Sequence, residues 1–403
     1  MTENLFLNFQ ANITVSKRKS ISDSLLRNLS AFYKGRRCII SENGANTDWH
    51  HLDENSSNTT FVNLIPISRD YNNLLERYRR IEAKADNWKG YDPIFFPEGL
   101  NNKSKHHFMR GDVALAYGCA RLASWMCRRY PSLFQKEKSH IQYSLDAMNC
   151  ARHSAMQNLM IDIIERDFIP YLQVSVSSIE KIKILEEMAA IYQEYGLINE
   201  ARELFDLINS NKNLISKEEQ YLQEARFLRR LAIINIQEKR DIIDAVDKLN
   251  AADKYADSNK RVAIQNALAW TKMSTNNATN AIDFLNPIVD KVFTRDGLPD
   301  TLFVAPWNAI ETLLTYYGAL LMKEKRNAKA IKNVEEQLIY ILQTYKNKDM
   351  QLRPIAYSLS SQFRGHSISK IEQLYTEILK PSNDIMSFAL NSILIKVVKL
   401  IRL

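Results

Sequence analysis

The stretch "EKIKILEEMAAIYQEYGLINEARELFDLINSN", residues 180–211, decides the fold of most of this chain. It consists of two amphipathic segments joined by a short break. Small residues and aromatic rings recur along it at helical spacing: Ala189, Tyr192, Gly196, Ala201 and Phe205. Small side chains let two helices approach each other, and aromatic rings fill the groove between them. The stretch therefore predicts a pair of packed helices.

Two later stretches repeat parts of this pattern. Residues 266–289 carry Ala269, Ala281 and Leu285 at matching places, and residues 315–338 carry Tyr317, Gly318, Ala330 and Val334. The three stretches resemble the helical hairpins of tetratricopeptide repeats, although the copies are unevenly spaced. The resemblance implies a divergent α-solenoid over residues 105–403. Such stacks bind proteins, peptides or nucleic acid on a concave surface.

The last twenty residues, "DIMSFALNSILIKVVKLIRL" (384–403), form an apolar segment with three basic residues. We expect a helix here that closes the end of the helical stack. The alternative is a helix that lies on a membrane surface or on a partner protein.

Composition agrees with long helices in a protein that has a real core. The chain has 403 residues, is 45% hydrophobic, and contains only 10 Gly and 10 Pro, so tight turns are few. A net charge of +8 permits a polyanionic partner without requiring one. The four cysteines form no CxxC pair, and no secretion signal or membrane-spanning run is present. We expect a cytoplasmic protein with free thiols.

The first ninety residues differ, because Gly, Asn, Ser and Thr interrupt short apolar pieces. We expect a helix beginning at Ser20, a strand at residues 36–41 and a second strand at 47–51. "FVNLIPI" (61–67) reads as an extended connection, and a helix is expected over 70–85. The order is helix, strand, strand, loop, helix.

Four polar residues fall at the ends of these pieces. His50 and His51 close the second expected strand, Asn63 lies in the extended connection, and Asn72 opens the last helix. In residue types, order and spacing, residues 36–80 resemble an HNH endonuclease, the ββα-metal nuclease module. "NLIPI" is also similar to the NLxxL that this family favours around its central Asn. The resemblance covers about a tenth of the chain.

The resemblance implies a role for each of these residues. His50 would be a metal ligand and His51 the general base, since adjacent strand residues point to opposite sides. Asn72 would be a second metal ligand, and Asn63 would fasten the loop and orient His51. Glu76 lies one helical turn after Asn72 and would be a third ligand. The nearest competitors for the ligand roles are Asn73 and Asp48.

The expected metal follows from the ligand types. Oxygen ligands favour Mg²⁺, with Mn²⁺ as a substitute, over Zn²⁺. Many members of the family also hold a structural zinc with two CxxC pairs. The corresponding places here read Cys38-Ile-Ile-Ser41 and Ser68-Arg-Asp-Tyr71, and one cysteine does not hold zinc. We therefore expect no structural zinc, and support from the first helix or from packing on the helical region.

Basic residues surround the motif and are candidates for contacts with phosphates: Arg36, Arg37, Arg69, Arg77 and Arg80. The alternative for each is a solvated charged face. A second histidine pair, His106-His107, has no asparagine at the matching distances, and we expect it at a solvated helix start. The chain has no P-loop motif and no Arg–His spacing of the HEPN ribonuclease type.

The sequence thus predicts a mostly α protein in two parts. A small ββα-metal nuclease domain would span residues 15–90, followed by a linker at 91–104 and the helical repeats at 105–403. The expected function is metal-dependent hydrolysis of DNA, with the repeats binding a protein partner or forming an oligomer. This architecture is similar to effectors of bacterial anti-phage defence. RNA as the substrate, or a non-catalytic helical scaffold with a degenerate nuclease module, are the alternatives.

Overall fold

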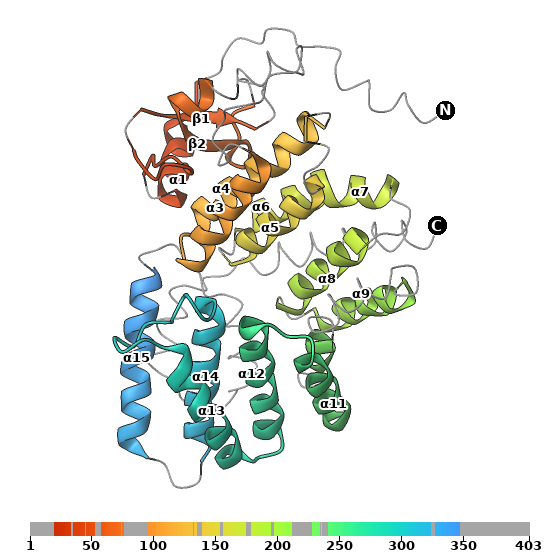
Figure 1. Ribbon diagram of the computed structural model, residues 1–403, viewed down its shortest axis with the longest axis vertical. Helices are drawn as coiled ribbons and strands as arrows, with labels where there is room; N and C mark the ends of the chain where they lie inside the picture. The colour runs from red at the N-terminus through yellow and green to blue at the C-terminus, as the bar shows by residue number, and fades with distance from the viewer. Residues whose placement is uncertain are drawn as a thin grey trace. The chain divides into compact units, whose positions relative to one another are not determined.

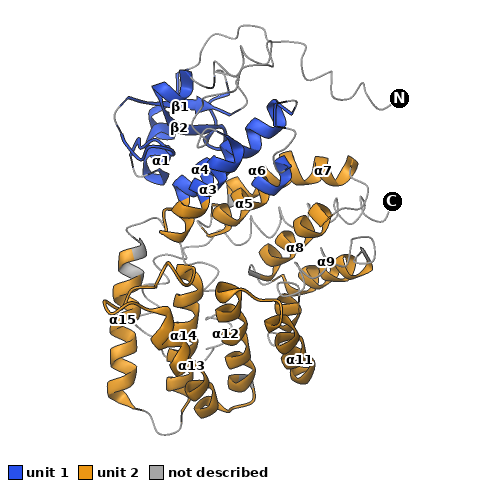
Figure 2. Ribbon diagram, viewed as in Figure 1, with its two compact units in different colours: residues 1–104, 114–143 blue, residues 105–113, 144–403 orange. Residues whose placement is uncertain are grey.

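The computed structural model describes residues 20–33, 35–44, 46–52, 58–73, 75, 96–131, 133–134, 139–153, 156–174, 179–194, 197–211, 228–233, 235, 241–323 and 327–346. The described part is mostly helical with one two-stranded sheet, as expected for the fold class. The chain divides into two compact units, coloured in Figure 2. The first unit comprises residues 1–104 and 114–143, and the second comprises 105–113 and 144–403.

The first unit contains the sheet and the helices nearest to it in sequence (Figure 1). Its elements are α1 (Asp23–Phe32), β1 (Thr47–His51), the short 3₁₀ helix η2 (Phe61–Asn63), β2 (Leu64–Ser68), residues 97–104 of α3 (Pro97–Met109), and α4 (Val113–Arg129) apart from its first residue. The predicted nuclease range therefore lies in one unit together with α4. Residues 97–104, expected in a linker, are helical.

Helix α1 forms where expected but begins later. Its N-cap is Ser22, whose hydroxyl accepts from the Leu25 amide, rather than Ser20. A serine at this position satisfies an amide that has no partner within the helix. Leu29 and Phe32 are the buried residues of this helix, and the Phe32 ring meets the rings of Tyr33 and Tyr117 edge-on.

The strands differ from the expectation in one respect. Residues 36–41 form turns instead of a strand, because the backbone folds back within the segment: the Glu42 amide donates to the Cys38 carbonyl, and Glu42 has a left-handed φ of 61°. The partner of β1 is β2, which lies in the stretch expected as an extended connection. The strands pair antiparallel, with Trp49 opposite Pro66. Proline is tolerated because both strands of a two-stranded sheet are edges.

Helix α4 packs against the turn that precedes the hairpin. The Cys119 thiol donates to the Ile39 carbonyl at 3.2 Å, and burial raises the pKa of this thiol, which keeps it protonated. A Cβ placed on Gly118 would lie 2.7 Å from Cγ2 of Ile39. Glycine thus lets α4 approach the turn, and Cys119 fixes the contact.

The regular elements in the described part of the second unit are helices, apart from one isolated bridge between Phe293 and Pro299. After residues 144–153 of α5 (His140–His153), its elements are α6 (Gln157–Ile163), the π-helical turn η4 (Ile164–Phe168), α7 (Ile169–Val174), α8 (Ile179–Glu194), α9 (Ile198–Asn211), α11 (Ile242–Asp253), α12 (Ser258–Ser274), α13 (Ala278–Val292), α14 (Pro306–Met322) and α15 (Ala328–Lys346).

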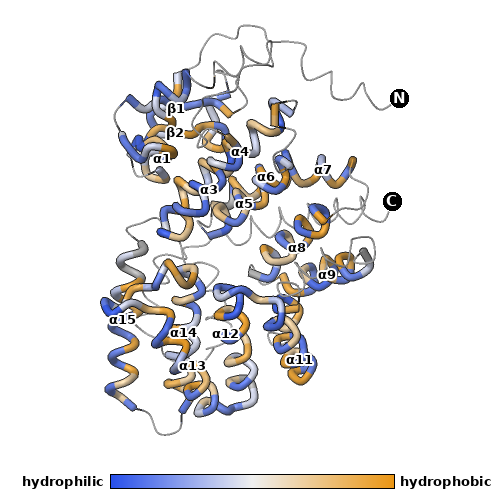
Figure 3. The backbone as a smooth tube through the Cα atoms, in the orientation of Figure 1, coloured by the Kyte–Doolittle hydropathy of each residue, from blue (hydrophilic) through white to orange (hydrophobic). Residues whose placement is uncertain are grey.

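The three repeat-like stretches coincide with helix pairs. Helices α8 and α9 pack together, as do α12 with α13 and α14 with α15. The positions singled out from the spacing are mostly buried: Ala189, Tyr192, Ala201, Phe205, Ala269, Ala281, Leu285, Tyr317, Gly318 and Val334. Ala330 is half-buried, and Gly196 lies outside the described residues. Apolar and polar residues alternate along these helices (Figure 3), which gives each helix a face for its neighbour.

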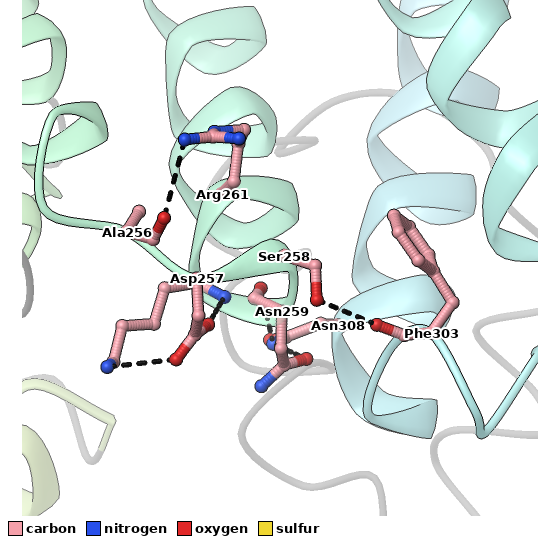
Figure 4. Close-up of polar contacts among 8 residues, drawn as sticks. Ala256, Asp257, Ser258, Asn259, Arg261, Phe303 and Asn308 are labelled. Carbon is pink, nitrogen blue, oxygen red and sulfur yellow. Dashed lines mark hydrogen bonds and ion pairs between the residues drawn. The ribbon is translucent and has the colours of Figure 1, made fainter.

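A small polar network connects the start of α12 to the start of α14 (Figure 4). Asp257 caps α12 by accepting from the Lys260 amide. Asn259 accepts from the Ala305 amide at 2.8 Å and from the Asn308 side chain at 3.0 Å. Because these contacts satisfy backbone and amide groups at both helix starts, they fix how the two helices align.

Two further expectations concern the apolar C-terminal segment and membrane-spanning helices. The apolar segment at 384–403 lies outside the described residues. Within the described part of the chain, no helix is both long and apolar enough to cross a membrane.

Candidate functional site

His50 and His51 are the last two residues of β1. His50 is opposite Ile65 of β2, and His51 is opposite Leu64. Neighbouring strand residues point to opposite sides of a sheet, so the two imidazoles leave the strand in different directions. His50 is 8% exposed and His51 is half-buried, and the Nε2 atom of each is shielded from solvent.

His50 lies against Asn72. Asn72 belongs to the helical residues 69–73 that directly follow β2. The Nδ1 atom of His50 is 3.0 Å from Oδ1 of Asn72, and with Nδ1 protonated the imidazole donates to the amide oxygen. Strand β1, strand β2 and the helical residues thus follow one another along the chain, and His50 of the first contacts Asn72 of the last.

Asn63 closes the connection between the strands. Its side chain is 1% exposed and donates from Nδ2 to the Asn58 carbonyl at 2.8 Å. Its own carbonyl accepts from the Leu52 amide, which extends the pairing one step beyond the strands. Asn63 therefore ties η2 to the loop before it. An orienting effect of Asn63 on His51 stays a prediction.

The aromatic residue beside His50 comes from α4. The rings of His50 and Trp125 meet edge to face, with centroids 5.5 Å apart and planes at 76°. Trp125 is 5% exposed, and its ring in turn meets Tyr130 edge to face at 5.7 Å. Sequence reasoning missed Trp125, because no local pattern indicates that α4 reaches the end of β1.

The expected phosphate contacts are described only in part. Arg36 and Arg69 are both exposed, and both approach the carboxylate of Asp48, at 4.0 and 3.5 Å. Arg36 also lies over the Trp49 ring at 5.8 Å. Two arginines thus share one acidic residue on β1, the strand that carries the histidines, and this carboxylate offsets part of their charge.

The structure describes some of the other expected site residues. Arg37 is half-buried. Glu76, the expected third ligand, lies outside the described residues, as do Arg77 and Arg80. Of the two competitors for the ligand roles, Asp48 points to the arginines instead, and Asn73 is exposed.

Cys38 and Ser68, which the sequence resemblance set against the family's cysteine pairs, lie next to each other. The Ser68 amide donates to the Cys38 sulfur at 3.2 Å. Cys38 is a buried free thiol, and the neighbouring Ile39 accepts from Cys119 of α4. Packing by α4, which belongs to the same unit, thus stabilises the base of the hairpin.

His50 and Asn72 would form one edge of a magnesium site with Nδ1 of His50 deprotonated, because the proton that makes the hydrogen bond occupies the lone pair that a metal ligand needs. Neighbouring ligands of an octahedral ion with bonds of about 2.1 Å are about 3 Å apart, which matches the separation of Nδ1 and Oδ1. Among the described residues, no three His, Cys, Asp or Glu side chains are grouped so that they would hold a metal ion. Of the three expected metal ligands, Glu76 lies outside the described residues, and Asn72 offers an amide oxygen rather than one of these side chains. Among the described residues, His50 is the expected ligand that would count toward a group of this kind.

Comparison with known proteins gives no match. No family model matches the chain, and no curated protein or solved structure matches it. The resemblance to HNH endonucleases therefore rests on the residues of the motif alone.

Proposed function

We propose that this protein is a metal-dependent endonuclease of the HNH type that hydrolyses DNA phosphodiester bonds. The observation that carries the proposal is the 3.0 Å approach of His50 Nδ1 to Asn72 Oδ1, between the loop end of the hairpin and the helical residues that follow β2.

The proposed roles divide between the two histidines. His50 and Asn72 would hold Mg²⁺, or Mn²⁺ in its place, with Glu76 as the expected third ligand. The bound ion would stabilise the charge that develops on the phosphate and on the leaving oxygen. His51 leaves β1 on the other side and would take a proton from the attacking water as general base. Asn63 would keep the connecting loop closed.

The exposed arginines at the hairpin support a nucleic-acid substrate. Arg36 and Arg69 flank β1 and would contact phosphates, which gives affinity without sequence preference. DNA is the proposed substrate and RNA is the alternative. Digestion of both polymers in parallel under the same conditions separates the two.

The second unit would act as a binding or regulatory part. Its packed helix pairs support a divergent α-solenoid of tetratricopeptide-like hairpins, whose surface would bind a protein partner or a second copy of the chain. A nuclease with a regulatory helical part is an architecture suited to anti-phage defence, in which cleavage begins only after a trigger.

The test is nicking of supercoiled plasmid DNA with Mg²⁺ or Mn²⁺ by the wild type, by His51→Ala and by His106→Ala. Removal of a general base lowers the rate by about 100-fold or more. We expect this loss for His51→Ala and an unchanged rate for His106→Ala, because His106 is exposed at the end of α3.

Equal nicking by the wild type and His51→Ala would remove His51 from the mechanism. If the wild type nicks neither DNA nor RNA, with or without proteins that co-purify from its host, the alternative holds. The chain is then a helical scaffold with a degenerate nuclease module.

A further inference from the structure

We propose that Trp125 of α4 is a positioning residue that holds the His50 imidazole in the orientation needed to bind a divalent metal ion. The inference rests on the proposed function, since it gives the metal-binding role to His50. It adds a residue from outside the expected nuclease range and makes α4 a part of the site.

The geometry shows how the His50 ring is held. Asn72 contacts the ring at Nδ1, which fixes the direction of that nitrogen. Trp125 contacts the ring edge to face at 5.5 Å, which restricts its rotation about the side-chain axis. The two contacts come from different elements and act on different features of the ring. Together they leave His50 few alternative rotamers.

Burial strengthens this restriction. His50 is 8% exposed and Trp125 is 5% exposed, so neither side chain moves into solvent without breaking the contact. Groups that orient a metal ligand commonly change metal affinity when they are removed, although they do not touch the ion. Trp125 is such an orienting group for His50.

Trp125 is itself held in place by α4. Its ring meets Tyr130 edge to face at 5.7 Å, just beyond the end of the helix. Further back along α4, Gly118 and Cys119 fasten the helix to the turn at Ile39. The same helix thus supports the base of the hairpin and places an aromatic ring beside its catalytic end.

The experiment uses the full chain and the variants Trp125→Leu and Trp125→Phe. Binding of Mn²⁺ is measured by the electron paramagnetic resonance signal of the free ion, and plasmid nicking is measured as kcat and KM. For Trp125→Leu we expect Mn²⁺ affinity to fall by about 3- to 10-fold, in line with the loss of one aromatic contact. The kcat should fall with the KM for DNA unchanged. Trp125→Phe keeps a ring and should restore most of the affinity.

The matched control is Trp270→Leu. Trp270 is a buried tryptophan of the second unit that donates to Thr315 at 2.7 Å. Its removal should lower stability and leave Mn²⁺ affinity unchanged. A Trp125→Leu protein that is folded by circular dichroism and binds Mn²⁺ as the wild type does would overturn the proposal.

A measurement without metal separates this proposal from the proposed function. The ring current of Trp125 shifts the carbon-bound proton resonances of His50, and Trp125→Leu should move them in the NMR spectrum. If they move while the wild type neither binds Mn²⁺ nor cleaves nucleic acid, the positioning contact stands and the nuclease assignment fails. Unmoved resonances would refute the positioning role whatever the activity.

Discussion

The chain contains two adjacent histidine pairs, and the structure places them in different surroundings. His50 and His51 end a strand, so their side chains leave on opposite sides of the hairpin. His106 and His107 lie in the last turn of α3. There His106 is exposed, His107 is 0% exposed, and their ring centroids are 6.2 Å apart. The second pair was expected at a solvated helix start; it lies at a helix end instead, and of the two only His106 is exposed.

The difference teaches that the dipeptide itself carries little functional information. His50 has an amide oxygen from a following helical turn at its Nδ1 atom and an indole ring at its side. His106 and His107 lie where a helix exposes its carbonyl groups, a place that favours basic side chains for electrostatic reasons alone. The partners brought by the fold, and not the repeated histidine, separate a candidate site from a helix end.

The largest expected effect comes from deleting one histidine of each pair. His50→Ala removes a proposed ligand and should weaken Mn²⁺ binding by about 100-fold, or about 2.7 kcal/mol. His107→Ala removes a buried side chain of the second unit and should lower the free energy of unfolding without changing Mn²⁺ affinity. Calorimetric titration with Mn²⁺ and urea unfolding measure the two quantities.

The contrast between the two histidine pairs fails if His50→Ala and His107→Ala behave alike. Normal Mn²⁺ binding by His50→Ala would show that the contact with Asn72 serves only the fold. Weak Mn²⁺ binding by a folded His107→Ala protein would move the metal site to α3.

A second prediction concerns the support beneath the first pair. Gly118→Ala places a Cβ against the branched side chain of Ile39, which has little freedom to move away, and should destabilise the protein by about 1–2 kcal/mol. Gly44→Ala is the control, because the nearest atom to a Cβ there is the Arg36 carbonyl oxygen at 3.9 Å. Urea midpoints of the two variants should differ, and equal midpoints would show that α4 does not pack tightly on the turn.

A third prediction asks whether aromatic packing alone marks a functional histidine. His153, at the end of α5, packs against Trp307 and Phe108 with ring centroids 4.5 and 5.3 Å away. Burial lowers the pKa of His153 well below its usual value, and Arg152 adds to this effect. In the folded protein His153 therefore stays neutral at pH values where it is protonated in the unfolded chain.

The sign of the pH effect follows from this difference. Below about pH 6.5 the unfolded chain binds the additional proton, so stability falls as pH falls, by about 1 kcal/mol from pH 6.5 to 5.5. His153→Phe has no such proton and should lose less stability over this interval in urea unfolding. Its nicking and Mn²⁺ binding at pH 7 should equal those of the wild type. If the wild type and His153→Phe lose equal stability between pH 6.5 and 5.5, the assignment of a lowered pKa to His153 is contradicted.

The smallest expected effect concerns the charge beside the first pair. Asp48→Asn removes the carboxylate that Arg36 and Arg69 share and should raise affinity for a DNA duplex by about two- to fivefold. The salt dependence of binding should also become steeper, because more arginine charge is available for phosphates. Asp253→Asn, which breaks an exposed ion pair with Arg261, is the control. Fluorescence anisotropy of labelled DNA over a salt series measures the affinity. An Asp48→Asn protein that binds DNA as tightly as the wild type would contradict the prediction.

Much of the helical architecture was readable from local patterns. The spacing of small and aromatic residues around Ala189 and Phe205 predicted the pair α8 and α9, because amphipathic periodicity and close packing depend on neighbours within a few turns. At the hairpin His50 contacts Asn72, whereas the side chain of Asn63 contacts Asn58. Glu76, the expected third ligand, lies outside the described residues.

The strand pairing was harder to predict from the sequence. Residues 36–41 have the composition of a strand but form turns, and Pro66 argued against a strand that nevertheless pairs with β1. Pairing depends on which segment lies alongside, and the sequence near each strand does not specify that.

The sequence by itself determined that this protein is mostly helical, and it determined where a histidine–asparagine motif would stand. Only the tertiary structure decided what surrounds the motif: Trp125 beside His50, Cys119 and Gly118 against Ile39, and Ser68 beside Cys38. The reason is physical. Helical periodicity is a local property of the chain, whereas these contacts join residues far apart in sequence and exist only once the elements have packed.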